Sequence, residues 1–145
     1  MIAPTPDRPF VFISYQREDI LKAEHLQKQL ERDGLATWKE DEHLAGERCD
    51  DVVMHAIHAS ACVVVLWSKA AVRCAAVMAA ATLARRLERL VPAVVERGVK
   101  PPWRFRWVHT HVLTDWISPV PGPHYMTLRR DARRLVSGVR GGAEG

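Results

Sequence analysis

Short apolar runs alternate with amphipathic segments along most of the chain. The run Phe10–Ile13 is apolar and β-prone, which predicts a buried strand. The next segment, Glu18–Asp33, carries apolar residues at helical spacing, and Gly34 follows it where a glycine commonly ends a helix. Further on, Ala61–Trp67 is apolar throughout, as expected of a central parallel strand that is covered on both faces. The pattern therefore predicts strands and helices in alternation.

The same pattern along the rest of the chain predicts five strands and four helices. The predicted strands are Phe10–Ile13, Leu35–Trp38, Ala61–Trp67, Leu90–Val95 and Val108–Leu113, and the predicted helices are Glu18–Asp33, Asp50–Ser60, Ala70–Leu87 and Tyr125–Val139. Because the connections are short, we expect parallel strands with helices on both faces of the sheet. The expected fold class is α/β, a single doubly wound, flavodoxin-like domain with strand order 2-1-3-4-5.

Composition supports one globular domain. The chain has 145 residues, of which 48% are hydrophobic and 26% are charged. We expect residues 1–8 to be a tail, 9–137 the domain, and 138–145 a flexible linker. The three cysteines are an odd number without close spacing, which argues against a disulfide framework and favours a reducing compartment. No apolar stretch reaches the roughly 18–20 residues that span a bilayer, so we expect a cytoplasmic protein without a membrane partner.

Positive charge gathers near the end of the chain. Residues 100–145 hold eight basic and three acidic side chains. The segment 129–140 contains five of these arginines but no aromatic residue, whereas general nucleic-acid binders interleave the two. We therefore interpret it as the solvated face of the last helix and do not expect nucleic acid as a partner.

The residues that follow the first and third strands are the candidate ligand-binding residues. In doubly wound sheets, ligands bind outside the carboxyl ends of the strands where the strand order reverses. This places Ser14, Tyr15 and Arg17 on one side and Ser68 on the other, with the loop 39–47 beside them. No Rossmann or Walker A glycine pattern is present, so neither nucleotide cradle is expected.

Each candidate has a structural alternative. Ser14 and Ser68 could bind a phosphate or a ribose, or could cap the helices that follow them. Arg17 could pair with a pyrophosphate or be solvated. Trp38 could stack on a base or pack in the core. The histidine pair His55/His58 lacks a third ligand, and we expect no metal site.

Four segments, in order and at matching spacing, resemble the sequence boxes of TIR domains of the bacterial type. The resemblance extends over residues 9–137. The segments are Phe10–Asp19 for the opening box, Gly34–Trp38 with Glu40–Glu47 for the second box and its BB loop, Ser60–Ser68 for the third strand, and Asp115-Trp116 for the late box.

The resemblance implies either of two modes of action. Some TIR domains are scaffolds, while others, including many bacterial ones, cleave NAD⁺ at the nicotinamide–ribose bond once assembled. In the enzymes, a Trp and a Glu lie eight and twelve residues after the serine that ends the third strand. Counted from Ser68, these positions are Ala76 and Ala80. NAD⁺ would be a substrate, and no cofactor is implied.

Alanine at position 80 matters because of how the nicotinamide–ribose bond is cleaved. Cleavage leaves an oxocarbenium-like sugar, which requires a carboxylate to stabilise it. A methyl group cannot do this, so we expect the chain to cleave NAD⁺ poorly or not at all. Alanine at 80 is either an introduced inactivating change, which the alanine-rich surroundings favour, or a natural loss, which the missing Trp at 76 favours. A related hydrolase or transferase of nucleotide sugars would need the same carboxylate.

The alternative function is a non-catalytic interaction scaffold. The resemblance implies other TIR domains as partners, in a homo-oligomer or filament, and a fused or separate sensor domain in a bacterial defence or signalling effector. The loop residues Asp41, Leu44 and Gly46 are the expected assembly contacts.

Overall fold

A computed structural model describes residues 8–40, 45–46, 50–114 and 122–144. The strands are β1 (Phe10–Ser14), β2 (Ala36–Lys39), β3 (Cys62–Trp67), β4 (Leu90–Val94) and β5 (His111–Val112). The α-helices are α1 (Ile20–Arg32), α2 (Asp51–Ala59), α3 (Lys69–Val72), α4 (Ala75–Arg86) and α5 (Pro123–Glu144), and two short 3₁₀ turns are η1 (Arg17–Asp19) and η2 (Trp103–Phe105).

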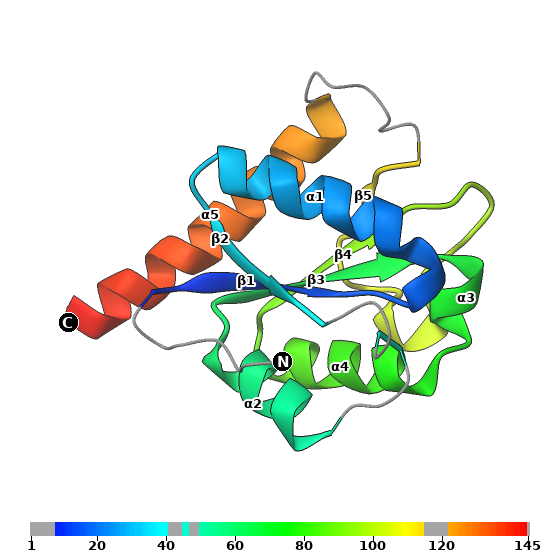
Figure 1. The fold of residues 1–145 in the computed structure, drawn as a ribbon, viewed down its shortest axis with the longest axis horizontal. Coiled ribbons are helices and arrows are strands. Elements are labelled where there is room, and N and C mark those ends of the chain that lie inside the picture. Colours follow the sequence, from blue (N-terminus) through cyan, green and yellow to red (C-terminus); the bar gives the residue numbers. More distant parts are fainter. Residues whose placement is uncertain (1–7, 41–44, 47–49, 115–121, 145) are drawn as a thin grey trace.

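The five strands form one parallel sheet in the order β2-β1-β3-β4-β5. Helices α1 and α5 cover one face, and α2 and α4 cover the other (Figure 1). The predicted fold class and strand order are confirmed. Ser14, the last residue of β1, pairs with Val65 of β3, so the carboxyl ends of these two strands lie side by side.

The core consists of two apolar layers, one on each face of the sheet. Alternate residues of β1 divide between them, with Ile13 facing α1 and α5 and Phe12 facing α2 and α4. Strand β3 does the same with Leu66 and Trp67. Because β1 and β3 are buried at every position, their sequences are largely apolar. Both strands could therefore be predicted accurately from the sequence.

The predicted helix Ala70–Leu87 is wrong as a single element. It is divided into α3 and α4 at Arg73 and Cys74. The Cys74 backbone is extended, and its Sγ donates to the carbonyl oxygen of Gly46 at 2.9 Å. A contact with a distant loop thus overrides the high helix propensity of an alanine-rich segment.

The ends of three other elements also differ from the prediction. The first helix opens with the η1 turn, and α1 begins at Ile20. The fifth strand is confined to His111–Val112, because Val108 turns back to donate to the Phe105 carbonyl. Helix α5 continues to Glu144, so residues 138–144, expected as a linker, are helical. Glycine weakens a helix without forbidding it, and no proline interrupts this segment.

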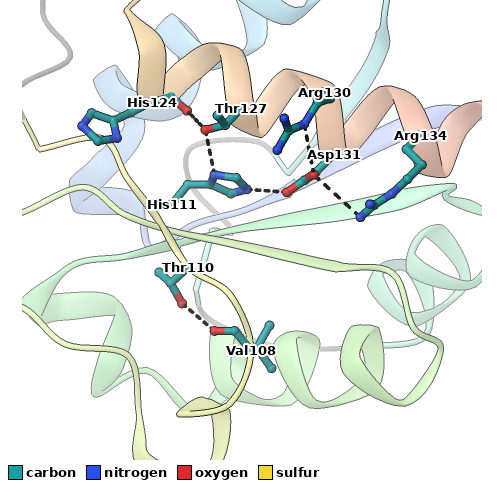
Figure 2. A network of polar contacts seen from close by, with 8 residues as sticks. All are labelled: Val108, Thr110, His111, His124, Thr127, Arg130, Asp131 and Arg134. Carbon is teal, nitrogen blue, oxygen red and sulfur yellow. Dashed lines mark hydrogen bonds and ion pairs between the residues drawn. The ribbon is translucent and has the colours of Figure 1, made fainter.

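A buried polar network ties β5 to α5 (Figure 2). The His111 ring lies 2.8 Å from Asp131 through Nε2 and 3.3 Å from the Thr127 hydroxyl through Nδ1. Arg130 and Arg134 approach the same Asp131 carboxylate from the solvent side. Burial lowers the pKa of His111 and outweighs the Asp131 carboxylate, which raises it. His111 is therefore neutral near pH 7, where it is hydrogen-bonded to Asp131.

This lowered pKa predicts a loss of stability in mild acid. The unfolded chain binds a proton at His111 near pH 6.5, above the pH at which the folded chain does, so stability falls as pH drops below about 6.5 and through the folded pKa. Urea unfolding followed by circular dichroism between pH 7.5 and pH 5 measures this slope. We expect His111→Gln to flatten it and His55→Gln, a change of an exposed histidine on α2, to preserve it. An unchanged slope in His111→Gln would contradict the assignment.

Candidate functional site

The carboxyl ends of β1 and β3 bring together a serine and an acidic side chain that lie far apart in sequence. The Ser68 hydroxyl donates to Asp19 Oδ2 at 2.5 Å, and both residues are buried. The same Ser68 oxygen accepts the Ala71 N–H at 3.1 Å and so caps α3. Ser68 therefore performs the capping role that the sequence allowed, and its one hydroxyl proton is committed to Asp19. Ser14, also buried, ends β1 beside them.

Asp19 is the site residue that sequence reasoning missed. Burial raises its pKa, and nearby Glu96 and Glu18 add to this, while the Ser68 hydrogen bond and the Lys22 ammonium act in the opposite direction. An acidic residue at the start of a helix is ordinarily a solvated contribution to the helix dipole. Its position five residues after the end of β1 could have indicated a site residue. The sequence does not show that its side chain is buried, because that burial depends on how the η1 turn packs on the strand ends.

A cavity of about 430 Å³ opens beside this pair, between α1 and the carboxyl ends of the sheet. Its volume is within the range of small-molecule sites, roughly 300–1,000 Å³. Lys22 and Glu96, which act on Asp19, also border it, and Lys22 Nζ donates to the Val95 carbonyl at 3.0 Å. Its apolar walls are Leu26, Leu66, Val95 and Leu113. The hollow thus lies on the α1 face of the sheet, away from α4.

Two predicted ligand residues on the β1 and β2 side have structural contacts in this fold. The Tyr15 hydroxyl donates to the Glu40 carbonyl at 2.7 Å, which fixes the chain just beyond β2. Trp38 packs on Phe12 with ring centroids 4.9 Å apart, in the layer between the sheet and α2 and α4. This agrees with the core alternative for Trp38.

The described part of the loop 39–47 lies against the same edge of the sheet. The Arg17 N–H donates to the Ala45 carbonyl at 3.3 Å, while the Arg17 side chain is exposed. Gly46 has φ +81°, and a Cβ there would lie 3.1 Å from Gln16 Cγ and 3.2 Å from Cys74 Sγ. Both the backbone conformation and the limited space therefore favour glycine at 46. The other two assembly residues, Asp41 and Leu44, lie outside the described residues, as does Asp115-Trp116.

Helix α4 carries alanine at the two positions, 76 and 80, where the resemblance to NAD⁺-cleaving TIR domains implied a Trp and a Glu. Ala76 is half-buried, and Ala80, one turn further on, is only 2% exposed within the apolar layer beneath the sheet. Along its whole length, Ala75–Arg86, the helix carries no acidic residue. Ala76 and Ala80 thus lie on the opposite face of the sheet from the cavity.

A family model described as TIR domain matches residues 11–119, which is most of the chain. No curated protein matches the chain in sequence. Among the described residues, no three His, Cys, Asp or Glu side chains gather to hold a metal ion. None of the helices in those same residues has the length and apolar character needed to cross a membrane.

Proposed function

Because the chain belongs to the TIR domain family, we propose that it is a signalling module that acts by associating with other TIR domains and does not itself cleave NAD⁺. The proposed lack of NAD⁺ cleavage rests on Ala80. Its methyl group is enclosed in the core at the position where the resemblance implies that NAD⁺-cleaving TIR domains have a carboxylate. On the resemblance alone, we further propose a bacterial defence or signalling effector with a fused or separate sensor domain.

Asp19 is a poor replacement for the missing glutamate. Stabilising an oxocarbenium-like sugar requires an ionised carboxylate that faces the ribose. Asp19 is buried, its pKa is raised mainly by that burial, and one of its oxygens is bonded to Ser68. These properties describe a group that fixes the junction of η1 with α3, which supports a structural role.

The expected result for the purified chain is no nicotinamide release above that of buffer with NAD⁺. Nicotinamide measured by chromatography at high protein concentration tests this. The comparison variant is Ala76→Trp/Ala80→Glu, whose folding is checked by circular dichroism because residue 80 is buried. Steady release by the unchanged chain would overturn the proposal, and loss of that release in Asp19→Asn would identify Asp19 as the carboxylate.

Association is expected to depend on Gly46. Alanine there must adopt a left-handed backbone and also press on Gln16 and Cys74, which displaces the 45–46 segment. The matched control is Gly98→Ala, since Gly98 has φ +80° but open space around its Cβ. Light scattering over a concentration series should show weaker association for Gly46→Ala only. A native chain that stays monomeric at every concentration would count against the proposal.

A further inference from the structure

The connection between β4 and β5 displays two indole rings to solvent. Trp103 is 77% exposed and Trp107 is 81% exposed. The Arg106 guanidinium lies over both, with its Cζ 4.0 Å from the Trp103 ring centroid and 5.5 Å from that of Trp107. Single exposed apolar residues are common, but exposed aromatic side chains that lie together often mark an interaction site. We call this stack of three planar groups, Trp103, Arg106 and Trp107, the indole–arginine stack.

The indole–arginine stack rests on a rigid support. Phe105, between its members, is buried and packs against Trp67 with ring centroids 5.7 Å apart. The Arg85 side chain donates to the Arg104 carbonyl at 2.6 Å, and Arg104 donates back to the Thr82 hydroxyl at 3.3 Å. The connection is thus fastened to α4 while its indoles stay exposed. A surface held in place in this way loses little conformational freedom when it binds.

The charged side chains next to the two indoles in the sequence are cations. Arg104 and Arg106 lie between Trp103 and Trp107, and residues 98–111 contain no acidic residue, while Arg97 borders the cavity on the α1 face. The Arg85 guanidinium adds a further cation from α4. A ligand that complements this surface carries regularly placed negative charges and flat groups that can stack on indole and guanidinium.

We infer that the indole–arginine stack binds single-stranded nucleic acid with little sequence preference. Bases stack on tryptophan and arginine planes, and phosphates pair with the surrounding cations. A lipid surface fits less well, because the apolar side chain between the indoles, Phe105, points into the core and arginines occupy the positions beside it. The segment 129–140, on which the sequence-based expectation against nucleic acid rested, lacks the aromatics that lie together with cations at 103–107.

The test measures binding of the full chain to a fluorescein-labelled oligothymidylate by anisotropy, at about 50 mM and 200 mM salt. We expect binding that weakens with salt. The variant Trp103→Ala/Trp107→Ala should weaken it by about fivefold to a hundredfold for each ring that stacks on a base. Phenylalanine at both positions should restore part of the affinity. Because both rings are exposed, these changes leave the core intact, and circular dichroism checks this.

Two controls separate stacking from simple attraction of charges. Arg130→Ala/Arg134→Ala removes two exposed cations from α5 and should leave the affinity within about twofold. Polyglutamate should compete poorly, because it carries charge but no bases. The inference is overturned by absence of oligonucleotide binding at low salt, by equal loss in the α5 variant, or by equal competition from polyglutamate. Tryptophan-dependent binding to phosphatidylserine vesicles in place of the oligonucleotide would also overturn it and point to a lipid surface.

Discussion

Replacing Trp67 with alanine is expected to lower the free energy of unfolding by about 3–5 kcal/mol. Trp67 is the last residue of β3 and is fully buried. Its indole packs against Phe105 in the layer shared with α4, so its loss leaves a cavity below the strand ends. The same cavity would loosen the support of the η2 turn. Urea denaturation followed by far-ultraviolet circular dichroism measures the change.

A phenylalanine at the same position separates packing from polarity. Within the described part of the chain, Trp67 Nε1 is buried without a hydrogen-bond partner. Phenylalanine removes this unsatisfied donor, whose burial is unfavourable, while it keeps most of the apolar volume. We expect Trp67→Phe to change the free energy of unfolding by no more than about 1 kcal/mol. A loss as large as that of Trp67→Ala would show that the N–H group or the full ring shape is needed.

The sheet could be predicted from the sequence because its central strands are buried on both faces. An apolar run such as Val63–Leu66 has few interpretations other than a central strand, and the helices between such runs force parallel pairing. The order of the strands followed from that topology. The short edge strand β5 was extended too far, since only two of its predicted residues pair with β4.

The site was less accessible to sequence because its contacts join distant segments. The bond between Ser68 and Asp19 spans 49 positions, and the contact of Cys74 with Gly46 spans 28. Neither is implied by local propensity, and the second of them breaks a segment whose alanines favour one continuous helix. At position 80 the sequence alone shows that the residue is alanine. It does not show that this alanine is buried beneath the sheet, because that depends on how α4 packs.

The second large effect is expected at Asp33, which joins the end of α1 to α5. Its carboxylate accepts the Tyr125 hydroxyl at 2.6 Å and faces Arg129 at 3.2 Å, and its backbone carbonyl accepts from Arg133 at 2.7 Å. Tyr125 is fully buried. Asp33→Ala would leave the tyrosine hydroxyl without this acceptor and Arg129 without its carboxylate. We expect the free energy of unfolding to fall by about 2–4 kcal/mol.

The pH dependence of stability identifies the cause of that loss. Burial raises the pKa of Asp33, but the hydrogen bonds from Tyr125, Arg129 and Gln29 outweigh it and hold the pKa below its ordinary value. The unfolded chain therefore protonates first, near pH 3.9. The contribution of Asp33 is complete above that pH and is lost as pH falls through the folded pKa.

Urea midpoints measured for the native chain and Asp33→Asn between pH 7 and pH 3 should therefore converge in acid. The asparagine preserves the shape of the side chain but not its charge, so a gap that persists unchanged at pH 3 would assign the effect to geometry and contradict the role of the ionised carboxylate. Tyr125→Phe completes a double-mutant cycle with Asp33→Ala, because the amide oxygen of an asparagine would still accept from the tyrosine hydroxyl. If the hydroxyl–carboxylate bond is the main contact, the two losses should add to more than the loss in the double variant, because each single change already removes the same interaction.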